Sequence, residues 1–224
     1  MEEYWLWSLK AGDETERRAA IAKLGDVGME NSLLRLTEIL TQGTPCPIIQ
    51  RSFRFLESGA VIVSAGARPA NMEEIRTAGA ASSAVNKIGE RLGRERAIRA
   101  ARNALQNRDL SQRARVFLAQ ELIIGSTPPA DLPEPLKKLR QKAIADDPQA
   151  DWNRFSSARP EAIDALVPAL DSTDEACRAG AAFALSFCGP EAKAAVPALE
   201  RATADPVPDV SQAAAEALRR IRGE

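Results

Sequence analysis

Apolar side chains recur at helical spacing in separate stretches of the chain. Between Met29 and Gln42, three leucines lie on one face of a helix: Leu33, Leu36 and Leu40. Near the C-terminal end, Ala181, Leu185 and Cys188 follow the same spacing. Residues three or four apart share one side of an α-helix, so both stretches are expected to be amphipathic helices packed by one face.

Two neighbouring segments near the C-terminal end repeat one another. One runs from Pro160 to Pro190 and the other from Pro190 to Arg222, and each opens with Pro-Glu-Ala. Both then contain Val-Pro-Ala-Leu, at 167–170 and at 196–199. Equivalent leucines are separated by 29 residues (Leu170 and Leu199) and by 33 residues (Leu185 and Leu218). This period is typical of helix–turn–helix repeats.

Local signals mark where these C-terminal helices begin and end. Asp171 and Ser172 are turn and N-cap candidates for a helix running to about Cys188, and Gly189 would end it. Proline inside a first helix removes a backbone donor, so a kink is expected at Pro168 and at Pro197.

The same signals return earlier in the chain. Segments 13–28 and 107–125 are each expected to be the second helix of a repeat. An acid stands four residues before an arginine at each of three helix starts, which favours capping and pairing within the helix. These pairs are Asp13 with Arg17, Asp109 with Arg113, and Asp174 with Arg178.

The middle of the chain is less regular. Residues 44–66 are expected to form one long helix, although the run of β-branched residues at 61–63 also suits a strand. Asn71 can cap a further helix carrying Ile88 and Leu92. We expect a single repeat domain over 1–224, with a Pro-rich loop at 126–135 joining blocks 1–125 and 136–224.

These repeats and the recurring Asp-x-x-x-Arg resemble HEAT repeats, including those of the phycobilisome-lyase type. The resemblance implies an all-α fold, a right-handed α-solenoid of about five to six helix pairs. It also implies a scaffold that binds a protein partner along a concave face lined by second helices. In this chain those helices would begin near Asp13, Asp109, Asp174 and Asp209.

Composition narrows the range of functions. The 224 residues contain no histidine, which excludes a histidine base, triad or metal ligand. Iron-binding deoxyhypusine hydroxylases, which resemble this fold but use histidine ligands, are thereby excluded. The three cysteines (Cys46, Cys177 and Cys188) have no metal or disulfide spacing and are read as reduced thiols. No cofactor or metal is expected.

The N-terminal residues and the hydropathy of the chain bear on its location. The first ten residues are acidic before a short apolar stretch, unlike a secretory signal, and no apolar run is long enough for a membrane span. We therefore expect a cytoplasmic protein, and the Ala- and Arg-rich composition suggests a bacterial source.

An arginine-rich stretch is the first candidate binding site. Residues 91–115 hold eight arginines against two carboxylates, a local net charge of +6 in a chain of net charge −1. Placed on one helix, four of these arginines would share about a third of its circumference. They would bind an anionic partner, or else form a solvated face or pair with acidic residues of neighbouring repeats. The candidates are Arg91, Arg94, Arg99, Arg102 and Arg113.

The first helix is the second candidate. Residues 4–9 are apolar around nearly the whole circumference, so the helix needs contacts on more than one side. Trp5 and Trp7 would form an interface with a partner, or else anchor the helix across the end of the core.

Together these features predict a non-enzymatic protein-interaction scaffold. One alternative is a HEAT-like nucleic-acid binder, of the kind found among alkylpurine DNA glycosylases, using the arginines at 91–115. A second alternative is a phycobilin-lyase-like accessory enzyme, although no residue pattern matches a bilin site.

Overall fold

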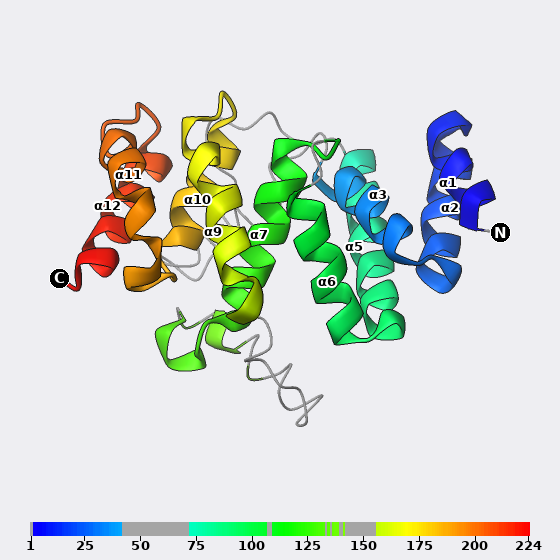
Figure 1. The fold of residues 1–224 in the computed structure, drawn as a ribbon. Coiled ribbons are helices and arrows are strands. Elements are labelled where there is room, and N and C mark those ends of the chain that lie inside the picture. Colours follow the sequence, from blue (N-terminus) through cyan, green and yellow to red (C-terminus); the bar gives the residue numbers. More distant parts are fainter. Residues whose placement is uncertain are drawn as a thin grey trace. The chain divides into compact units, whose positions relative to one another are not determined.

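The structure is a computed structural model that describes residues 2–41, 72–106, 109–132 and 156–224, with 134, 136–138 and 141. Regular structure in these ranges consists of α-helices and short 3-10 helices, without any strand. The predicted all-α solenoid class of fold is confirmed. The chain divides into two compact units: the first ends at Ala114 and the second runs from Arg115 to Glu224 (Figure 1). The predicted long helix at 44–66 lies outside the described residues.

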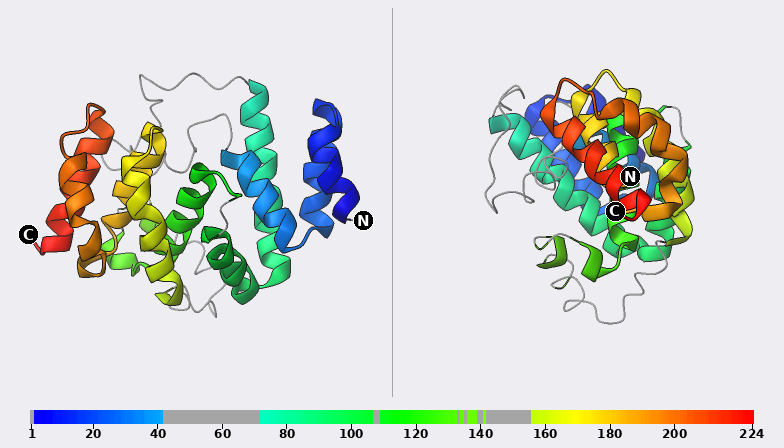
Figure 2. Two further views of the ribbon diagram at one scale, coloured as in Figure 1. Left: turned by 45° about the horizontal axis from the view of Figure 1, so that its top comes forward. Right: turned by 90° about the vertical axis from the view of Figure 1, so that its left-hand side faces the viewer.

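The first unit is built on one long helix. Helices α1 (Glu2–Ala11) and α2 (Glu14–Val27) pack together, and α2 and α3 (Glu30–Thr41) both pack on α5 (Met72–Leu92). Helix α6 (Arg94–Leu105) follows and contacts α3 and α5 (Figure 1, Figure 2). The helices predicted at 13–28, at 29–42 and after residue 71 are therefore confirmed.

Capping explains where α2 begins. The Asp13 carboxylate accepts a hydrogen bond from the Glu16 N–H (2.9 Å), and the Glu16 carboxylate accepts one from the Asp13 N–H (3.2 Å). This reciprocal capping box satisfies two backbone donors that a helix start leaves free.

The predicted second helix at 107–125 is present as α7 (Gln112–Ser126), and the division between the units falls within it. It begins after a turn at Asp109 and Leu110. A 3-10 turn at Pro129–Asp131 lies within the predicted Pro-rich loop.

Between residues 156 and 224, the second unit contains two helix pairs. In the first pair, α9 (Arg159–Leu166) continues as the 3-10 helix η3 (Val167–Asp171) and packs on α10 (Glu175–Leu185). In the second, the 3-10 helix η4 (Gly189–Ala195) continues as α11 (Val196–Ala202) and packs on α12 (Pro208–Arg222). Helix α10 also packs on α12, and nearly all of its residues are buried. The four leucines that defined the repeat period are likewise buried: Leu170, Leu185, Leu199 and Leu218.

The prolines interrupt both first helices, as predicted. Helix α9 gives way to η3 one residue before Pro168, and η4 gives way to α11 one residue before Pro197. Gly189, at a φ of 52°, follows the turn that ends α10.

The acid expected to cap this helix start caps α10, whereas the other two candidates, Asp171 and Ser172, precede the cap. Asp174 occupies that position, and its carboxylate accepts a hydrogen bond from the Ala176 N–H (3.0 Å). The Ser172 hydroxyl instead accepts from the Asp174 N–H (3.2 Å). Capping requires the residue directly before the first helical one, so Ser172 shapes the preceding turn.

No described helix is long and apolar enough to cross a bilayer.

Candidate functional site

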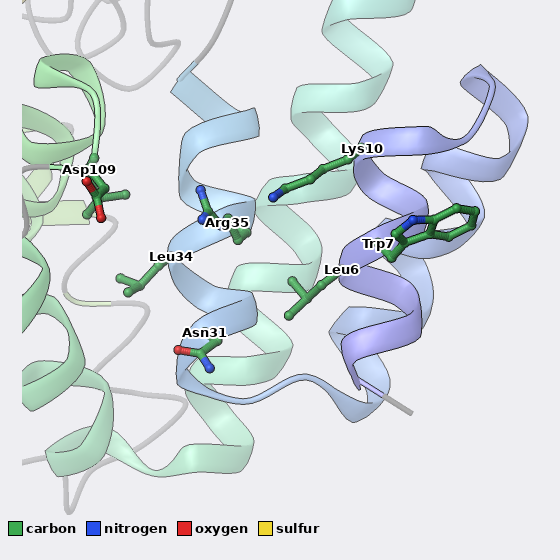
Figure 3. A pocket seen from close by; sticks show the side chains of 8 residues that line it. Leu6, Trp7, Lys10, Asn31, Leu34, Arg35 and Asp109 are labelled. Carbon is green, nitrogen blue, oxygen red and sulfur yellow. The ribbon is translucent and has the colours of Figure 1, made fainter.

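A groove on the first unit lies between α1, α3 and the turn at 109–111. Leu6 and Lys10 point from α1 toward α3, where Leu34 and Arg35 lie (Figure 3). The hollow has a volume of about 440 Å³, enough for one or two side chains of a ligand. A neighbouring hollow shares several of these residues and extends the groove to Arg17, Glu38, Ile39 and Ser111.

A carboxylate at the start of α1 fixes one wall of the groove. Glu2 accepts hydrogen bonds from the Met29 N–H (2.8 Å) and from the Ser32 hydroxyl (2.5 Å), both at the start of α3. Partial burial raises the pKa of Glu2, but the hydrogen bonds from Ser32 and Met29 outweigh it and hold the pKa below its usual value. The charged carboxylate thus links the first turns of α1 and α3.

A second carboxylate fixes the opposite wall. Glu38 of α3 is buried and accepts hydrogen bonds from both the backbone N–H and the hydroxyl of Ser111. The Ser111 hydroxyl also accepts from the Ala114 N–H (3.2 Å), so both groups lie at the positive end of α7. These bonds hold the 109–111 turn against α3.

The cations of the groove have no partner within the described part of the chain. Lys10, Arg17 and Arg35 line it, and none of them makes an ion pair or side-chain hydrogen bond there. The carboxylates are already used, since Glu38 binds Ser111 and Asp109 has its own electrostatic contacts. The groove therefore presents unpaired positive charge beside partly exposed leucines.

Helix α1 carries three aromatic residues, of which Trp7 lines the groove. Tyr4 and Trp7 are 60% and 62% exposed, whereas Trp5 is half-buried and meets Tyr4 edge-on with ring centroids 4.9 Å apart. In Figure 3 the Trp7 ring points away from α3. The buried residues of this helix are Ser8 and Leu9. The prediction that Trp7 anchors the helix to the core is therefore wrong, while the prediction that it contacts a partner stays a prediction.

The predicted arginine stripe does not lie on one helix, so that part of the prediction is wrong. Gly93, with a φ of 76°, separates α5 from α6. This conformation favours glycine and ends the α5 helix at Leu92. Arg91 thus lies on α5, Arg94, Arg99 and Arg102 on α6, and Arg113 on α7.

The arginines that the structure places have different surroundings. The Arg91 guanidinium donates to the backbone carbonyls of Gly25, Asp26 and Gly28, at the end of α2. Arg99 is exposed, whereas Arg102 and Arg113 are half-buried. Arg91 thus caps the end of α2, and anion binding by the five candidate arginines stays a prediction.

The cysteines offer no reactive thiol in the described residues. Cys177 and Cys188 are buried, and burial raises the pKa of Cys188 to about 12. A thiol of this kind stays protonated and unreactive at neutral pH. The described part of the chain also contains no cluster of three or more His, Cys, Asp or Glu side chains suited to a metal ion.

Several residues of the groove escape prediction from the sequence alone. Lys10, Leu34 and Arg35 come together only because α1 and α3 pack with their first turns linked through Glu2. A weak signal was present, since Leu34 and Arg35 stand off the Leu33, Leu36 and Leu40 face of their helix.

Comparison with known proteins identifies the repeats. Residues 153–219 match a family model of HEAT repeats, which confirms the predicted resemblance in the region of the two C-terminal helix pairs. No match was found among curated proteins.

Two solved structures are similar at low TM-scores. One is an engineered protein, 18% identical, with a TM-score of 0.34 over 99% of this chain and 96% of that chain. The other is a designed armadillo repeat protein, 17% identical, with a TM-score of 0.32 over 99% of this chain and all of that chain. The assignment of repeats therefore rests on the family match and the observed helix pairs.

Proposed function

We propose that this chain, which carries HEAT repeats at 153–219, is a non-enzymatic scaffold that binds a protein partner. The observation that carries the proposal is the groove between α1 and α3, where unpaired cations and partly exposed leucines share one surface. Burial of such leucines would favour association by about 25 cal/mol per Å² of apolar area. A scaffold requires only this complementarity of surface.

The chemistry of the described residues supports a binding role over an enzymatic one. The sequence has no histidine to serve as a base, and the two described thiols are buried. The carboxylates of the groove accept hydrogen bonds at helix starts, where they stabilise the fold. Lys10 and Arg35 are suited to electrostatic recognition.

A wider surface remains part of the proposal. The second helices that begin near Asp13, Asp109, Asp174 and Asp209 would line a concave face that contacts the same partner. Repeat proteins commonly bind along such extended faces, with exposed side chains setting the specificity. The groove would then add a contact on the first helices.

Affinity capture tests the proposed function. The full chain would be immobilised, exposed to extract of its source cells with and without nuclease treatment, and washed at about 0.15 M salt, where charge contacts to a protein partner still act. We expect a defined protein to be retained near equal stoichiometry after nuclease treatment. Retention of nothing, or only of material that disappears with nuclease, would count against a protein scaffold and favour the nucleic-acid alternative.

A further inference from the structure

We propose that the groove between α1 and α3 binds an acidic segment of the partner that carries a leucine-like side chain. This inference rests on the proposed scaffold function and names the chemistry of its partner. The occupant is a polypeptide with carboxylates for Lys10 and Arg35 and an apolar residue for the space between Leu6 and Leu34.

The charge of the groove points to carboxylates. Lys10, Arg17 and Arg35 have no partners within the described part of the chain. By contrast, Arg178 pairs with Asp205 and Arg201 with Asp171 in the second unit. A carboxylate placed between Lys10 and Arg35 would gain charge-assisted hydrogen bonds from both without breaking an existing pair.

The apolar lining points to a peptide that is not purely acidic. Leu6 and Leu34 are half-buried in the chain alone, and Leu110 closes the space beside them. A volume of about 440 Å³ holds a leucine-sized side chain with room for its backbone. Covering these leucines supplies the part of the affinity that salt does not screen.

The same lining disfavours a nucleic acid. Leucine side chains offer no hydrogen bonds to bases and no aromatic stacking platform. The aromatic Trp7 lies at the edge with its ring directed away from α3.

Fluorescence anisotropy with the full chain tests the inference directly. The probe is a labelled 14-residue peptide with two leucines four residues apart among glutamates. Two comparison peptides replace either all glutamates by glutamine or both leucines by serine. We expect each replacement to weaken binding at least tenfold, because the groove needs both features.

Charge-matched variants locate the binding site. Lys10→Glu with Arg35→Glu should weaken binding of the acidic peptide at least tenfold. Lys23→Glu with Lys193→Glu changes two exposed lysines outside the groove by the same total charge, and should leave the affinity within twofold. Equal losses in both double variants would overturn the site, because they would show only a general effect of net charge.

A control of folding keeps the test decisive. Melting followed by circular dichroism must be unchanged in Lys10→Glu with Arg35→Glu. If those substitutions unfold the unit, Leu34→Ser serves as the second variant, with the same expected loss.

The remaining outcomes separate this inference from the proposed function. Capture of a protein partner without binding of the acidic peptide overturns the inference and leaves the scaffold role intact. Tighter binding of duplex DNA, or of vesicles with one-third anionic lipid, through Lys10 and Arg35 also overturns it. Failure to capture any protein, whatever the peptide result, counts against the scaffold function itself.

Discussion

The ion pair between Arg178 and Asp205 joins the two C-terminal repeats at the scale of single residues. The guanidinium donates to both carboxylate oxygens, at 2.6 and 3.1 Å, and also to the Ser172 carbonyl at 2.9 Å. Asp205 in turn accepts from the Val207 N–H at 2.9 Å, just before α12. Because both side chains are largely buried, solvent and salt screen the attraction between their charges only weakly.

Replacing Asp205 by asparagine should lower the free energy of unfolding by about 2–3 kcal/mol at pH 7, because a largely buried guanidinium would lose its counter-charge. The hydrogen bond from Arg178 holds the pKa of Asp205 below its ordinary value of 3.8, despite partial burial. A carboxyl group with a lowered pKa stabilises the fold at pH values above its ordinary pKa, and this stabilisation is lost as the pH falls through the folded-state pKa. The free energy of unfolding is measured by urea denaturation at pH 7, 5 and 3.

Asp171→Asn is the matched control for this prediction. Asp171 pairs with Arg201, but both side chains are about 60% exposed, so the change should stay below about 0.5 kcal/mol. If Asp205→Asn cost no more than this control at pH 7, the pair would not join the repeats energetically.

Arg91 is the residue whose role changed most between sequence and structure. Its guanidinium donates to three carbonyls at the end of α2, where a helix leaves carbonyl groups without partners. Arg91→Ala should therefore cost about 1–2 kcal/mol in unfolding of the first unit. Arg91→Lys should recover little, because an ammonium group lacks the planar fork. A stable Arg91→Ala that loses DNA binding would restore the predicted binding role.

At the scale of helices, local signals explain what the sequence predicts. The capping aspartate at 13 and the spacing of Leu33, Leu36 and Leu40 act within one helix, so they are readable along the chain. The break at Gly93 was missed, although a glycine that ends a helix is a local signal of the same kind as Gly189. Likewise, Arg178 was expected to pair with Asp174 in its own helix, yet it hydrogen-bonds to Asp205 in the next repeat. Contacts between helices, and the groove that they form, cannot be predicted from the spacing of residues within one helix.

Helices α2 and α5 approach closely at a glycine. A Cβ added at Gly25 would lie 3.1 Å from both Cα and Cβ of Ala84, which is tighter than ordinary contact. Gly25→Val should therefore destabilise the first unit by about 1–3 kcal/mol, as overpacking usually does. Gly89→Ala is the control, because no atom lies within 4 Å of its added Cβ. That change should stabilise α5 by up to about 1 kcal/mol, and thermal melting of both variants measures the contrast.

At the scale of the whole molecule, the helices of the second unit between residues 156 and 224 contact helices of their own repeat and of the adjacent repeat. Helix α10 packs on α9 with η3 and on α12, and α11 packs on η3 and α12. In arrays of this kind, stability is approximately a sum of repeat and interface contributions, so damage at one interface spreads weakly. The two compact units are thus expected to open with different free energies.

Hydrogen exchange of the full chain carrying Asp205→Asn measures this independence. Amides of α10, α11 and α12 should exchange faster by roughly 30-fold or more, the factor that corresponds to about 2 kcal/mol. Amides of α2, α3 and α5 should keep their wild-type rates, because the substituted pair makes no contact within the first unit. Equal acceleration in both units would mean that the chain unfolds as one cooperative body, and a partner bound to the α1–α3 groove would then stabilise every repeat.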